Sequence, residues 1–465
     1  MADHPLDGGA RLDLKRPRNV HVVGVGGAGM SAIATVLADM GHTVTGSDLK
    51  ASAGLERLRS RGLEVVVGHA ADNLGAVDAV TISTAVPANN PEVVAARERG
   101  IPVLRRADAL AAISSTRRTL AVAGTHGKTT TSSMLALVLV EAGMHPSFII
   151  GGDVNEIGTG AVWDAGEWFV VEADESDGTF LELGAEVAIV TNIEPDHLEY
   201  YGSYEALLDA FSRFLADAAG PRIVCADDEV AARIGREVGA VSYGFADDAD
   251  YRLVDPALER NGTTFTLRHA GEDLGRVHLP VPGRHNALNA AAALVAGLEV
   301  GAPFAAGQAA IERFAGVARR FEFRGETGGI TFVDDYAHLP TEVEAALEAA
   351  SEGAWGRVVC VFQPHRFSRI ADLWQDFGGA FGEADRLVVT DIYPAGEAPR
   401  PGISGKLIVN AVLDADPWRP LAYLPKRPDL VPYLSSVLRP GDLCLTLGAG
   451  DLTSLADEVQ AAMRS

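Results

Sequence analysis

Short apolar runs alternate with longer amphipathic stretches along the first quarter of the chain. Between residues 20 and 115 the apolar runs are VHVVGVG, TVTGSD, LEVVVG, DAVTIST and IPVLRR, and segments of helical length, such as 30–40, separate them. Strands that alternate with helices form parallel sheets, because each helical crossover returns the chain to the same end of the sheet. The pattern therefore predicts a doubly wound α/β domain over residues 1–115.

The same alternation begins again twice. The second segment, expected over 116–318, contains the strands TLAVA, WFVVEAD, VAIVTN and RIVCAD, and its runs YRLVD, TTFTLRH and RVHLPV near 251–279 predict an antiparallel insertion. The third segment, expected over 319–465, contains GITFVDD, GRVVCVFQ, RLVVTDIY and DLCLTLGAG. We therefore predict three α/β domains, with ligands at the strand ends, where polar and glycine residues gather.

Composition and charge remove several classes of function. The 465 residues include 63 acidic and 39 basic side chains, a formal charge of -24, so a nucleic acid or an anionic membrane would be repelled. Three scattered cysteines do not suggest a disulfide framework or a zinc site. No apolar run reaches 18 residues, and the stretch MADHPLDGGARLDLKRPR has no hydrophobic core behind its charges. We expect a soluble, cytoplasmic protein, either a monomer or a weak homodimer.

The segment GTHGKTT, residues 124–130, has the features of a nucleotide-phosphate loop. It follows an apolar strand and opens an Ala/Leu/Val-rich helix, so its backbone N–H groups and the helix N-terminus favour an anion. Lys128 can reach the β- and γ-phosphates, and the Thr129 hydroxyl can bind Mg²⁺. The motif lacks the first glycine of the full Walker pattern, because Val122 stands there. The alternative is a glycine turn without a ligand.

A second glycine loop lies near the N-terminus. Gly24, Gly26 and Gly29 follow the strand VHVV, and Asp48 closes the next strand, as in dinucleotide-binding proteins. This arrangement suits any pyrophosphate at a helix N-terminus, so UDP fits as well as NAD.

Polar side chains also end two later strands of the central segment. One group is Glu172, Asp174, Glu175 and Asp177, and the other is Asn192, Glu194, Asp196 and His197. Oxygen ligands beside a phosphate loop suit Mg²⁺, although solvated loop carboxylates would give the same pattern.

Two further motifs carry candidate binding groups. His285, Asn286 and Asn289 open an alanine-rich helix, where the amides can read an adenine edge or simply cap the helix. In the last segment, Arg366 and Arg369 can hold a carboxylate, or only keep a helix start soluble. Asp334, Asp335, Tyr336 and His338 are expected after the strand ITFV, and His365 directly precedes Arg366.

Taken together, these motifs resemble those of the Mur ligases. The resemblance runs from about Asn19 to LGAGDLTSLA near the C-terminus. Its ten markers are GVGGAGMSAIA (24–34), GSD (46–48), GTHGKTTT (124–131), EADESD (172–177), TNIEPDHLEYYGS (191–203), PGRHNALNA (282–290), RRFE (319–322), DDYAHLPTEV (334–343), FQPHRFSR (362–369) and AGEAPRPGIS (395–404). Ten motifs in one order are far more specific than any one of them.

The resemblance implies an ATP-driven amide synthesis in three domains, which bind in turn a UDP-sugar, ATP and an amino acid. The first domain is Rossmann-like, the central one resembles a phosphate-loop ATPase and the last is again Rossmann-like. The implied substrates are UDP-N-acetylmuramate and L-alanine, and the implied cofactors are ATP and Mg²⁺, with Mn²⁺ as an alternative ion.

The resemblance also implies roles for individual residues. Those expected to bind the UDP-sugar are Gly26, Gly27, Ala28, Gly29, Met30, Ser31, Asp48, Ser83 and Thr84. Those expected to bind ATP are Gly124, Thr125, His126, Gly127, Lys128, Thr129, Thr130, Asn286, Asn289, Arg320 and Asp335. Thr129 is implied for one Mg²⁺, and Glu172 and His197 for another. Tyr336, His338, Arg366 and Arg369 would hold L-alanine and the muramoyl end, and the implied catalytic set is Lys128, Glu172, His197, His338, Arg366 and Arg369.

Two departures from the family pattern bear on the amino acid. Relatives that add later residues usually carry a lysine, carbamylated to bridge the metals, after the DH motif, and residues 198–220 contain no lysine. This favours the alanine-adding member. The family also commonly has a second histidine where Leu339 stands, and leucine cannot replace its hydrogen bonds.

Three alternatives stay open at this point. A recycling ligase that attaches an intact peptide to UDP-N-acetylmuramate shares most of these motifs. A nicotinamide dehydrogenase would explain residues 24–48 but not GTHGKTT. A nucleotide-dependent switch would use GTHGKTT but would not need PHRFSR.

Overall fold

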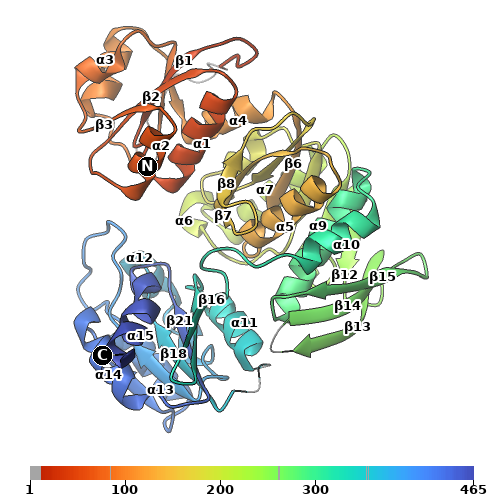
Figure 1. The fold of residues 1–465 in the computed structure, drawn as a ribbon, viewed down its shortest axis with the longest axis vertical. Helices are drawn as coiled ribbons and strands as arrows, with labels where there is room; N and C mark the ends of the chain where they lie inside the picture. Colours follow the sequence, from red (N-terminus) through yellow and green to blue (C-terminus); the bar gives the residue numbers. More distant parts are fainter. Residues whose placement is uncertain (1–11, 84, 260–261, 352, 354, 465) are drawn as a thin grey trace. The chain divides into compact units, whose positions relative to one another are not determined.

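Three β-sheets with flanking helices make up the protein (Figure 1). The computed structural model describes residues 12–83, 85–259, 262–351, 353 and 355–464. The chain divides into two compact units, one holding the chain up to Val254 with Leu267–Gly275 and Leu288–Ile311, and the other Asp255–Thr266, Arg276–Ala287 and the chain from Glu312. No helix within the described residues is long and apolar enough to cross a membrane. The predicted α/β class is confirmed, and the domain limits at 115/116 and 318/319 stay a prediction.

The N-terminal sheet has the order β3-β2-β1-β4-β5, and all its pairs are parallel. Its strands are β1 (Asn19–Val23), β2 (Thr43–Asp48), β3 (Glu64–Val67), β4 (Ala79–Ile82) and β5 (Val103–Arg105), and its helices are α1 (Ala28–Asp39), α2 (Ala53–Ser60), α3 (Pro91–Glu98) and α4 (Arg106–Ser114). The chain builds outward from β1 to β3 and then returns to β4 on the other side of β1. That reversal is a topological switch point, where open α/β sheets bind ligands beyond the strand ends.

The central sheet has ten strands in the order β15-β14-β13-β12-β11-β10-β6-β9-β7-β8. Its strands are β6 (Arg118–Ala123), β7 (Ser147–Val154), β8 (Thr159–Val162), β9 (Trp168–Glu172), β10 (Val187–Val190), β11 (Arg222–Cys225), β12 (Val241–Gly244), β13 (Tyr251–Glu259), β14 (Gly262–His269) and β15 (Glu272–Leu279). The strands β11, β10, β6, β9 and β7 are parallel, and β8 pairs antiparallel with β7. The stretch 251–279, expected to be an antiparallel insertion, continues this sheet beyond β12, and its first strand, β13, pairs parallel with β12.

Six helices accompany the central sheet: α5 (Lys128–Glu141), α6 (Leu198–Tyr201), α7 (Tyr204–Ala216), α8 (Glu229–Val238), α9 (Arg284–Glu299) and α10 (Phe304–Glu312). Helix α5 is buried from Thr129 to Leu139, which is possible because its side chains are small or apolar on nearly all sides. It packs against β6, β7 and β9. This packing fixes the first turn of α5 at the end of β6, next to the ends of β9 and β10.

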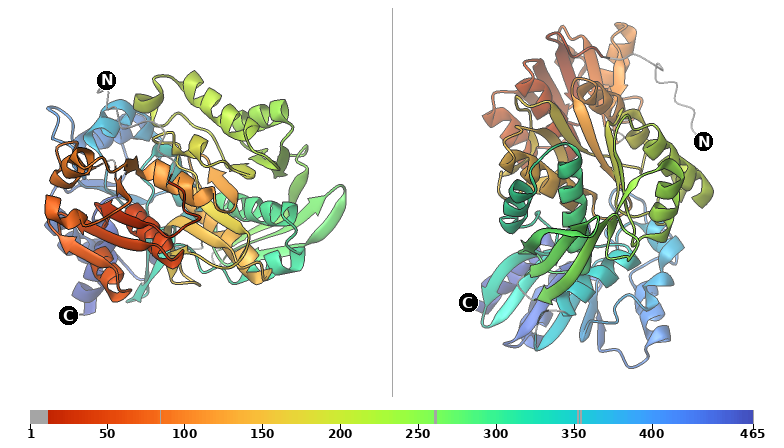
Figure 2. Two further views of the ribbon diagram at one scale, coloured as in Figure 1. Left: turned by 90° about the horizontal axis from the view of Figure 1, so that it is seen from above. Right: turned by 90° about the vertical axis from the view of Figure 1, so that its right-hand side faces the viewer.

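The C-terminal sheet has the order β16-β17-β21-β18-β19-β20, in which β16 is antiparallel and the other pairs are parallel. Its elements are β16 (Glu322–Thr327), β17 (Ile330–Asp335), α11 (Pro340–Ser351), β18 (Arg357–Phe362), α12 (Phe367–Leu373), β19 (Arg386–Val389), α13 (Lys406–Ala415), β20 (Leu421–Tyr423), α14 (Leu430–Val437), β21 (Asp442–Leu447) and α15 (Leu455–Arg464). Helices α11, α12 and α13 share one apolar core with the sheet, and α14 and α15 share another. The sheet is therefore covered on both faces. Figure 2 draws the strands and helices of this part of the chain in cyan to blue. Asp334 and Asp335, expected just after a strand, are the last two residues of β17.

Candidate functional site

The loop between β6 and α5 has a backbone that requires glycine. Gly124 has a φ of +129° and Gly127 a φ of +81°. A Cβ on Gly124 would lie 2.1 Å from the Thr191 Oγ1, and a Cβ on Gly127 would lie 2.3 Å from the Asn289 Oδ1. The glycines of GTHGKTT therefore allow the end of β10 and helix α9 to approach the loop backbone closely.

The end of β10 braces this loop. The His126 N–H donates to the Asn192 Oδ1 at 2.8 Å, and the Asn192 Nδ2 donates back to the His126 carbonyl at 3.1 Å. The Thr125 N–H donates to the Asn192 carbonyl, and the Thr125 Oγ1 accepts from the Glu194 N–H. Asn192 and Glu194, which the sequence offered as oxygen ligands, thus hold the loop. The N–H groups in the first turn of α5 have no partners within the helix. Such groups favour the binding of an anion at the start of the helix.

Lys128 directs its ammonium group back into the loop. Its Nζ donates to the Gly124 carbonyl at 2.6 Å, to the Thr125 carbonyl at 3.2 Å and to the Glu175 Oε1 at 2.8 Å. Burial alone would lower the pKa of Lys128, but the carboxylates of Glu175 and Asp174 outweigh it and raise that pKa. The lysine is therefore charged, and its three N–H donors all have acceptors.

Glu172, at the end of β9, lies directly beside the first turn of α5. Its carboxylate accepts from the Thr129 Oγ1 at 3.0 and 3.1 Å and from the Gly151 N–H at 2.8 Å. His197 lies beside its neighbour Asp196, with 3.2 Å between Nε2 and Oδ2. No cluster of three or more His, Cys, Asp or Glu side chains suited to a metal occurs in the described part of the chain. Of the three residues predicted to bind Mg²⁺, Thr129 and Glu172 are hydrogen-bonded to each other, and their role at a metal stays a prediction.

The predicted pyrophosphate loop lies at the switch point of the N-terminal sheet. The Gly26 N–H donates to the Asp48 Oδ2 at 2.9 Å, and a Cβ on Gly24 would lie 3.2 Å from the Ser83 Oγ. The loop, Asp48 and Ser83 are therefore together, as expected. The Ser31 Oγ donates to the Ala28 carbonyl within α1. Thr84 falls outside the described residues.

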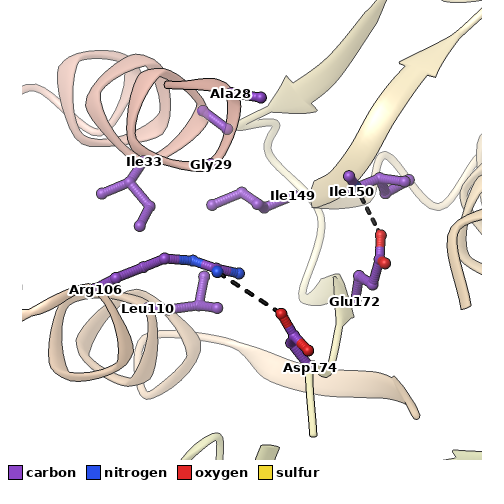
Figure 3. Close-up of a pocket in the computed structure, with 11 residues that line it drawn as sticks. Ala28, Gly29, Ile33, Arg106, Leu110, Ile149, Ile150, Glu172 and Asp174 are labelled. Atoms are coloured by element: carbon purple, nitrogen blue, oxygen red, sulfur yellow. Dashed lines mark hydrogen bonds and ion pairs between the residues drawn. The ribbon is translucent and has the colours of Figure 1, made fainter. Parts of the chain in front are cut away.

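A cavity of about 220 Å³ joins this loop to the end of β9 (Figure 3). One wall is the first half of α1, and another is the stretch 149–151 with Glu172 and Asp174. Arg106, at the start of α4, reaches into it, and its Nη1 lies 3.8 Å from the Asp174 Oδ2. Although burial raises the pKa of Asp174, the charges of Lys128 and Arg106 and hydrogen bonds from Ser176 hold that pKa below its usual value.

The two asparagines expected at adenine are buried in the first turns of α9. The Asn286 Nδ2 donates to the Pro282 carbonyl at 2.7 Å. The Asn289 Oδ1 accepts from the Thr131 Oγ1 at 3.2 Å, which ties α9 to α5. Both contacts are structural, and the expected role of these amides at adenine stays a prediction.

The C-terminal unit gathers a second set of predicted residues at the ends of β17 and β18. The His338 Nδ1 lies 3.0 Å from the Tyr336 carbonyl and 3.2 Å from the Glu342 Oε2, and its ring contacts that of His365 edge to face. The Arg369 Nη1 lies 3.1 Å from the His365 Nδ1. Arg366 immediately precedes α12, with a φ of +67°. The cationic and aromatic groups of this edge therefore belong to one connected cluster.

Asp335 and Arg320 lie at the same sheet edge. Asp335 accepts from the N–H groups of Phe321 and Ala337, both at 2.7 Å, and the Arg320 guanidinium lies over the Tyr336 ring. Burial, only partly offset by Arg320 and these bonds, raises the pKa of Asp335 to about 6. Leu339 is buried at 6% exposure, and its N–H donates to Glu342.

Sequence reasoning gave no role to several groups that shape these sites. Arg106 lies in an ordinary-looking helix start, Glu175 was only one of several acids, and Glu342 belongs to the same motif as His338 but was given no role. Spacing within DDYAHLPTE places His338 and Glu342 four residues apart, a signal that would have found this pair. The partners of Arg106 and Glu175 lie far away in the sequence and give no such signal.

The geometry defines a nucleotide-binding enzyme with a phosphate loop, a separate pyrophosphate-type loop and a cavity between them. The chain matches three consecutive family models: Mur ligase family, catalytic domain over 19–118, Mur ligase middle domain over 122–297, and Mur ligase, glutamate ligase domain over 319–450. A UDP-N-acetylmuramate–L-alanine ligase of Pelotomaculum thermopropionicum is 46% identical over 451 residues, which cover 96% of this chain and 98% of the relative. The chain belongs to the Mur ligase family.

Solved structures agree with this assignment. The UDP-N-acetylmuramate–alanine ligase of Thermotoga maritima is 30% identical with a TM-score of 0.81, over 96% of this chain and 99% of that one. A murein peptide ligase of Psychrobacter arcticus has a TM-score of 0.69 over 96% of this chain and 98% of its own, and its identity of 23% shows the fold alone. The family uses ATP, so the predicted nucleotide is confirmed, and a nicotinamide dehydrogenase is not supported.

Proposed function

We propose that this protein joins L-alanine to the lactyl carboxylate of UDP-N-acetylmuramate, using ATP, in the synthesis of peptidoglycan precursors. The observation that carries the proposal is the 46% identity to a relative of that name along nearly its whole length. The cavity supports it physically, because it links the start of α1 to Glu172 and Asp174 beside the phosphate loop.

In this proposal the phosphate loop and Lys128 hold the β- and γ-phosphates of ATP. The three acceptors of the Lys128 ammonium place it inside the loop, so phosphate oxygens reach it by replacing one of them. A positive charge held there stabilises the negative charge that spreads over the γ-phosphoryl group during transfer.

The residues at the end of β9 fit Mg²⁺. Thr129 and Glu172 offer a hydroxyl and a carboxylate oxygen within 3.1 Å of each other, and hard oxygen ligands beside phosphates are what Mg²⁺ prefers. Thr129 would hold one ion, and Glu172 with His197 another. Bound Mg²⁺ supplies charge neutralisation on the phosphates.

The reaction we propose has two chemical steps. The lactyl carboxylate attacks the γ-phosphorus of ATP, the bond to ADP breaks, and an acyl phosphate forms. The amine of L-alanine then attacks the acyl carbon, phosphate leaves as the amide forms, and the proton lost by the amine passes to a base. Both steps require exclusion of water, since the acyl phosphate is readily hydrolysed.

In the C-terminal unit, Arg366 and Arg369 are proposed to bind carboxylates, and Tyr336 and His338 to line the amino-acid site. The neighbouring His365 accepts the Arg369 contact through Nδ1, which restricts the orientation of that guanidinium. Burial is the main reason that the pKa of His338 is lowered, and the charge of Arg369 acts in the same direction.

The deciding experiment measures ADP release with UDP-N-acetylmuramate and, in turn, L-alanine, glycine or the tripeptide of the recycling reaction. We expect release that requires the nucleotide sugar and is fastest with L-alanine. Preference for the tripeptide would assign the recycling reaction instead. Lys128→Ala should abolish release while UDP-N-acetylmuramate binding, measured by calorimetry, stays nearly intact.

A further inference from the structure

The cavity beside α1 is lined by a positively charged side chain, that of Arg106, to which the proposed reaction has so far given no role. Its lining combines apolar side chains such as Ile33 and Ile149 with the carboxylates of Glu172 and Asp174 and the guanidinium of Arg106 (Figure 3). Arg106 supplies the positive charge of this lining. In a chain with a formal charge of -24, an anionic substrate needs such a local cation.

The Arg106 side chain lies against the first turn of α1. A Cβ on Gly29 would lie 3.4 Å from the Arg106 Nε and 3.7 Å from its Cζ. These are ordinary van der Waals distances, so the guanidinium lies in contact range of the first turn of α1. The N–H groups of this turn lack partners within the helix, so the guanidinium and the helix N-terminus present positive potential side by side.

The pairing of Arg106 with Asp174 leaves the guanidinium available. At 3.8 Å the two groups attract each other without a hydrogen bond, and both side chains are 30% exposed. Within the described part of the chain, no residue hydrogen-bonds to the Arg106 guanidinium. An incoming anion can therefore form charge-assisted bonds with Arg106 without first breaking a strong internal contact.

We propose that Arg106 binds an anionic group of the UDP-linked substrate and thereby positions the lactyl carboxylate for attack on ATP. This inference rests on the proposed function. Two groups of that substrate share the required chemistry, its diphosphate and its lactyl carboxylate. The cavity extends from the helix N-terminus suited to the first group to the acids beside the phosphate loop, where the second must react.

The test compares Arg106→Met and Arg106→Lys with the wild-type protein. Arg97→Met is the matched control, because Arg97 is an exposed arginine of α3 in the same sheet domain and away from the cavity. Dissociation constants are measured by calorimetry for three probes. UDP carries the diphosphate alone, UDP-N-acetylglucosamine adds the sugar, and UDP-N-acetylmuramate adds the lactyl carboxylate.

We expect Arg106→Met to weaken UDP-N-acetylmuramate binding by about 10- to 100-fold, the value of a charge-assisted hydrogen bond. Arg106→Lys should recover part of the loss, and Arg97→Met should bind like the wild type. If Arg106→Met weakens the binding of all three probes equally, Arg106 binds the diphosphate. If it weakens the binding of UDP-N-acetylmuramate alone, Arg106 binds the lactyl carboxylate.

Unchanged binding of all three probes by Arg106→Met would overturn the inference. The failure of the proposed function is distinct, because the wild-type protein would then release no ADP with UDP-N-acetylmuramate and L-alanine. Circular dichroism and thermal unfolding of each variant establish that the fold is intact. A KM for ATP that changes as much as the KM for UDP-N-acetylmuramate would also contradict a role at the nucleotide sugar.

Discussion

The buried ion pair between Lys128 and Glu175 makes a strong prediction about the stability of the nucleotide-free protein. The Glu175 side chain is 3% exposed and that of Lys128 is 14% exposed, with 2.8 Å between Nζ and Oε1. The second oxygen of Glu175 is buried and has no hydrogen-bond partner among the described residues. Removing Lys128 therefore leaves a buried carboxylate without its ion-pair partner.

The cost of each substitution can be worked out from these contacts. Loss of one partner of a buried pair costs about 3–5 kcal/mol, and we expect Lys128→Met to fall near the lower value because some water reaches this side chain. Glu175→Gln leaves the ammonium with two carbonyl acceptors and an amide oxygen, at a cost of about 2–3 kcal/mol. The double variant buries no unpaired charge, so it should be about 2 kcal/mol more stable than the sum of the single losses predicts.

The assay is denaturant-induced unfolding of the four proteins without nucleotide, followed by circular dichroism. Losses that add to within about 0.5 kcal/mol would refute the reasoning, because independent sites behave that way. Measurement in high salt supplies a further check. A buried pair is screened much less than an exposed one, so the coupling should persist there.

Three further predictions concern other parts of the chain. Burial by itself raises the pKa of Glu92, but bonds from His21, Ser47, Asn73 and the Ala70 N–H lower it from 4.5 to about 2. Glu92→Gln should therefore cost about 3 kcal/mol at pH 7. The difference from the wild type in unfolding free energy should shrink as the pH falls from about 4.5 towards 2, whereas the exposed Glu98→Gln should show no such trend. Gly127→Ala should destabilise the protein by about 2–4 kcal/mol and raise the KM for ATP. Gly143→Ala is the control, because Gly143 also has a positive φ, +69°, but a Cβ there would meet open space. It should lose only the stability that the backbone strain costs. Equal losses of stability in the two variants would rule out a contribution from the clash with Asn289. Leu339→His should change the KM for L-alanine more than that for ATP and cost about 1–3 kcal/mol of stability through burial of a polar ring. Leu339→Met is its control, and an unchanged KM for L-alanine would mean that Leu339 only packs.

Much of the fold follows from local patterns in the sequence. The strands β1, β6, β9, β10, β17, β18 and β21 are apolar runs bounded by polar or glycine residues, and burial on both faces of the sheets explains why they do not alternate. Strands β7, β8, β12, β16 and β20 were not predicted. β8, β16 and β20 are edge strands, β7 is interrupted by two glycines, and β12 is only four residues long. Such strands carry a weak local signal, so their formation depends on their neighbours in the sheet.

The residues of the candidate site likewise fall into two groups, those that a local motif identifies and those that only the folded chain brings together. The glycines, Lys128 and Thr129 form one contiguous motif, so the sequence alone was enough to predict a phosphate loop. Arg106 and Asp174 are 68 residues apart, and Lys128 and Glu175 are 47 apart. The first pair meets where the first two sheets pack together, and the second pair meets because β6 and β9 are neighbours in the central sheet. Several acids in EADESD looked equivalent until their contacts were known.

The missing Walker glycine can be explained by where the loop finds its support. A loop that is short and rich in glycine loses much conformational entropy when it becomes ordered, and here that cost is offset from outside the loop. The Asn192 side chain binds both the N–H and the carbonyl of His126, and the Thr191 Oγ1 donates to the same carbonyl at 2.6 Å. The end of β10 thus holds the loop in shape before any nucleotide arrives. Because Lys128 is also held by internal acceptors, we expect ATP binding to require the exchange of one contact rather than the ordering of a flexible loop. On our proposal the loop is therefore a preorganised phosphate site, whose shape depends on β10 as much as on its own glycines.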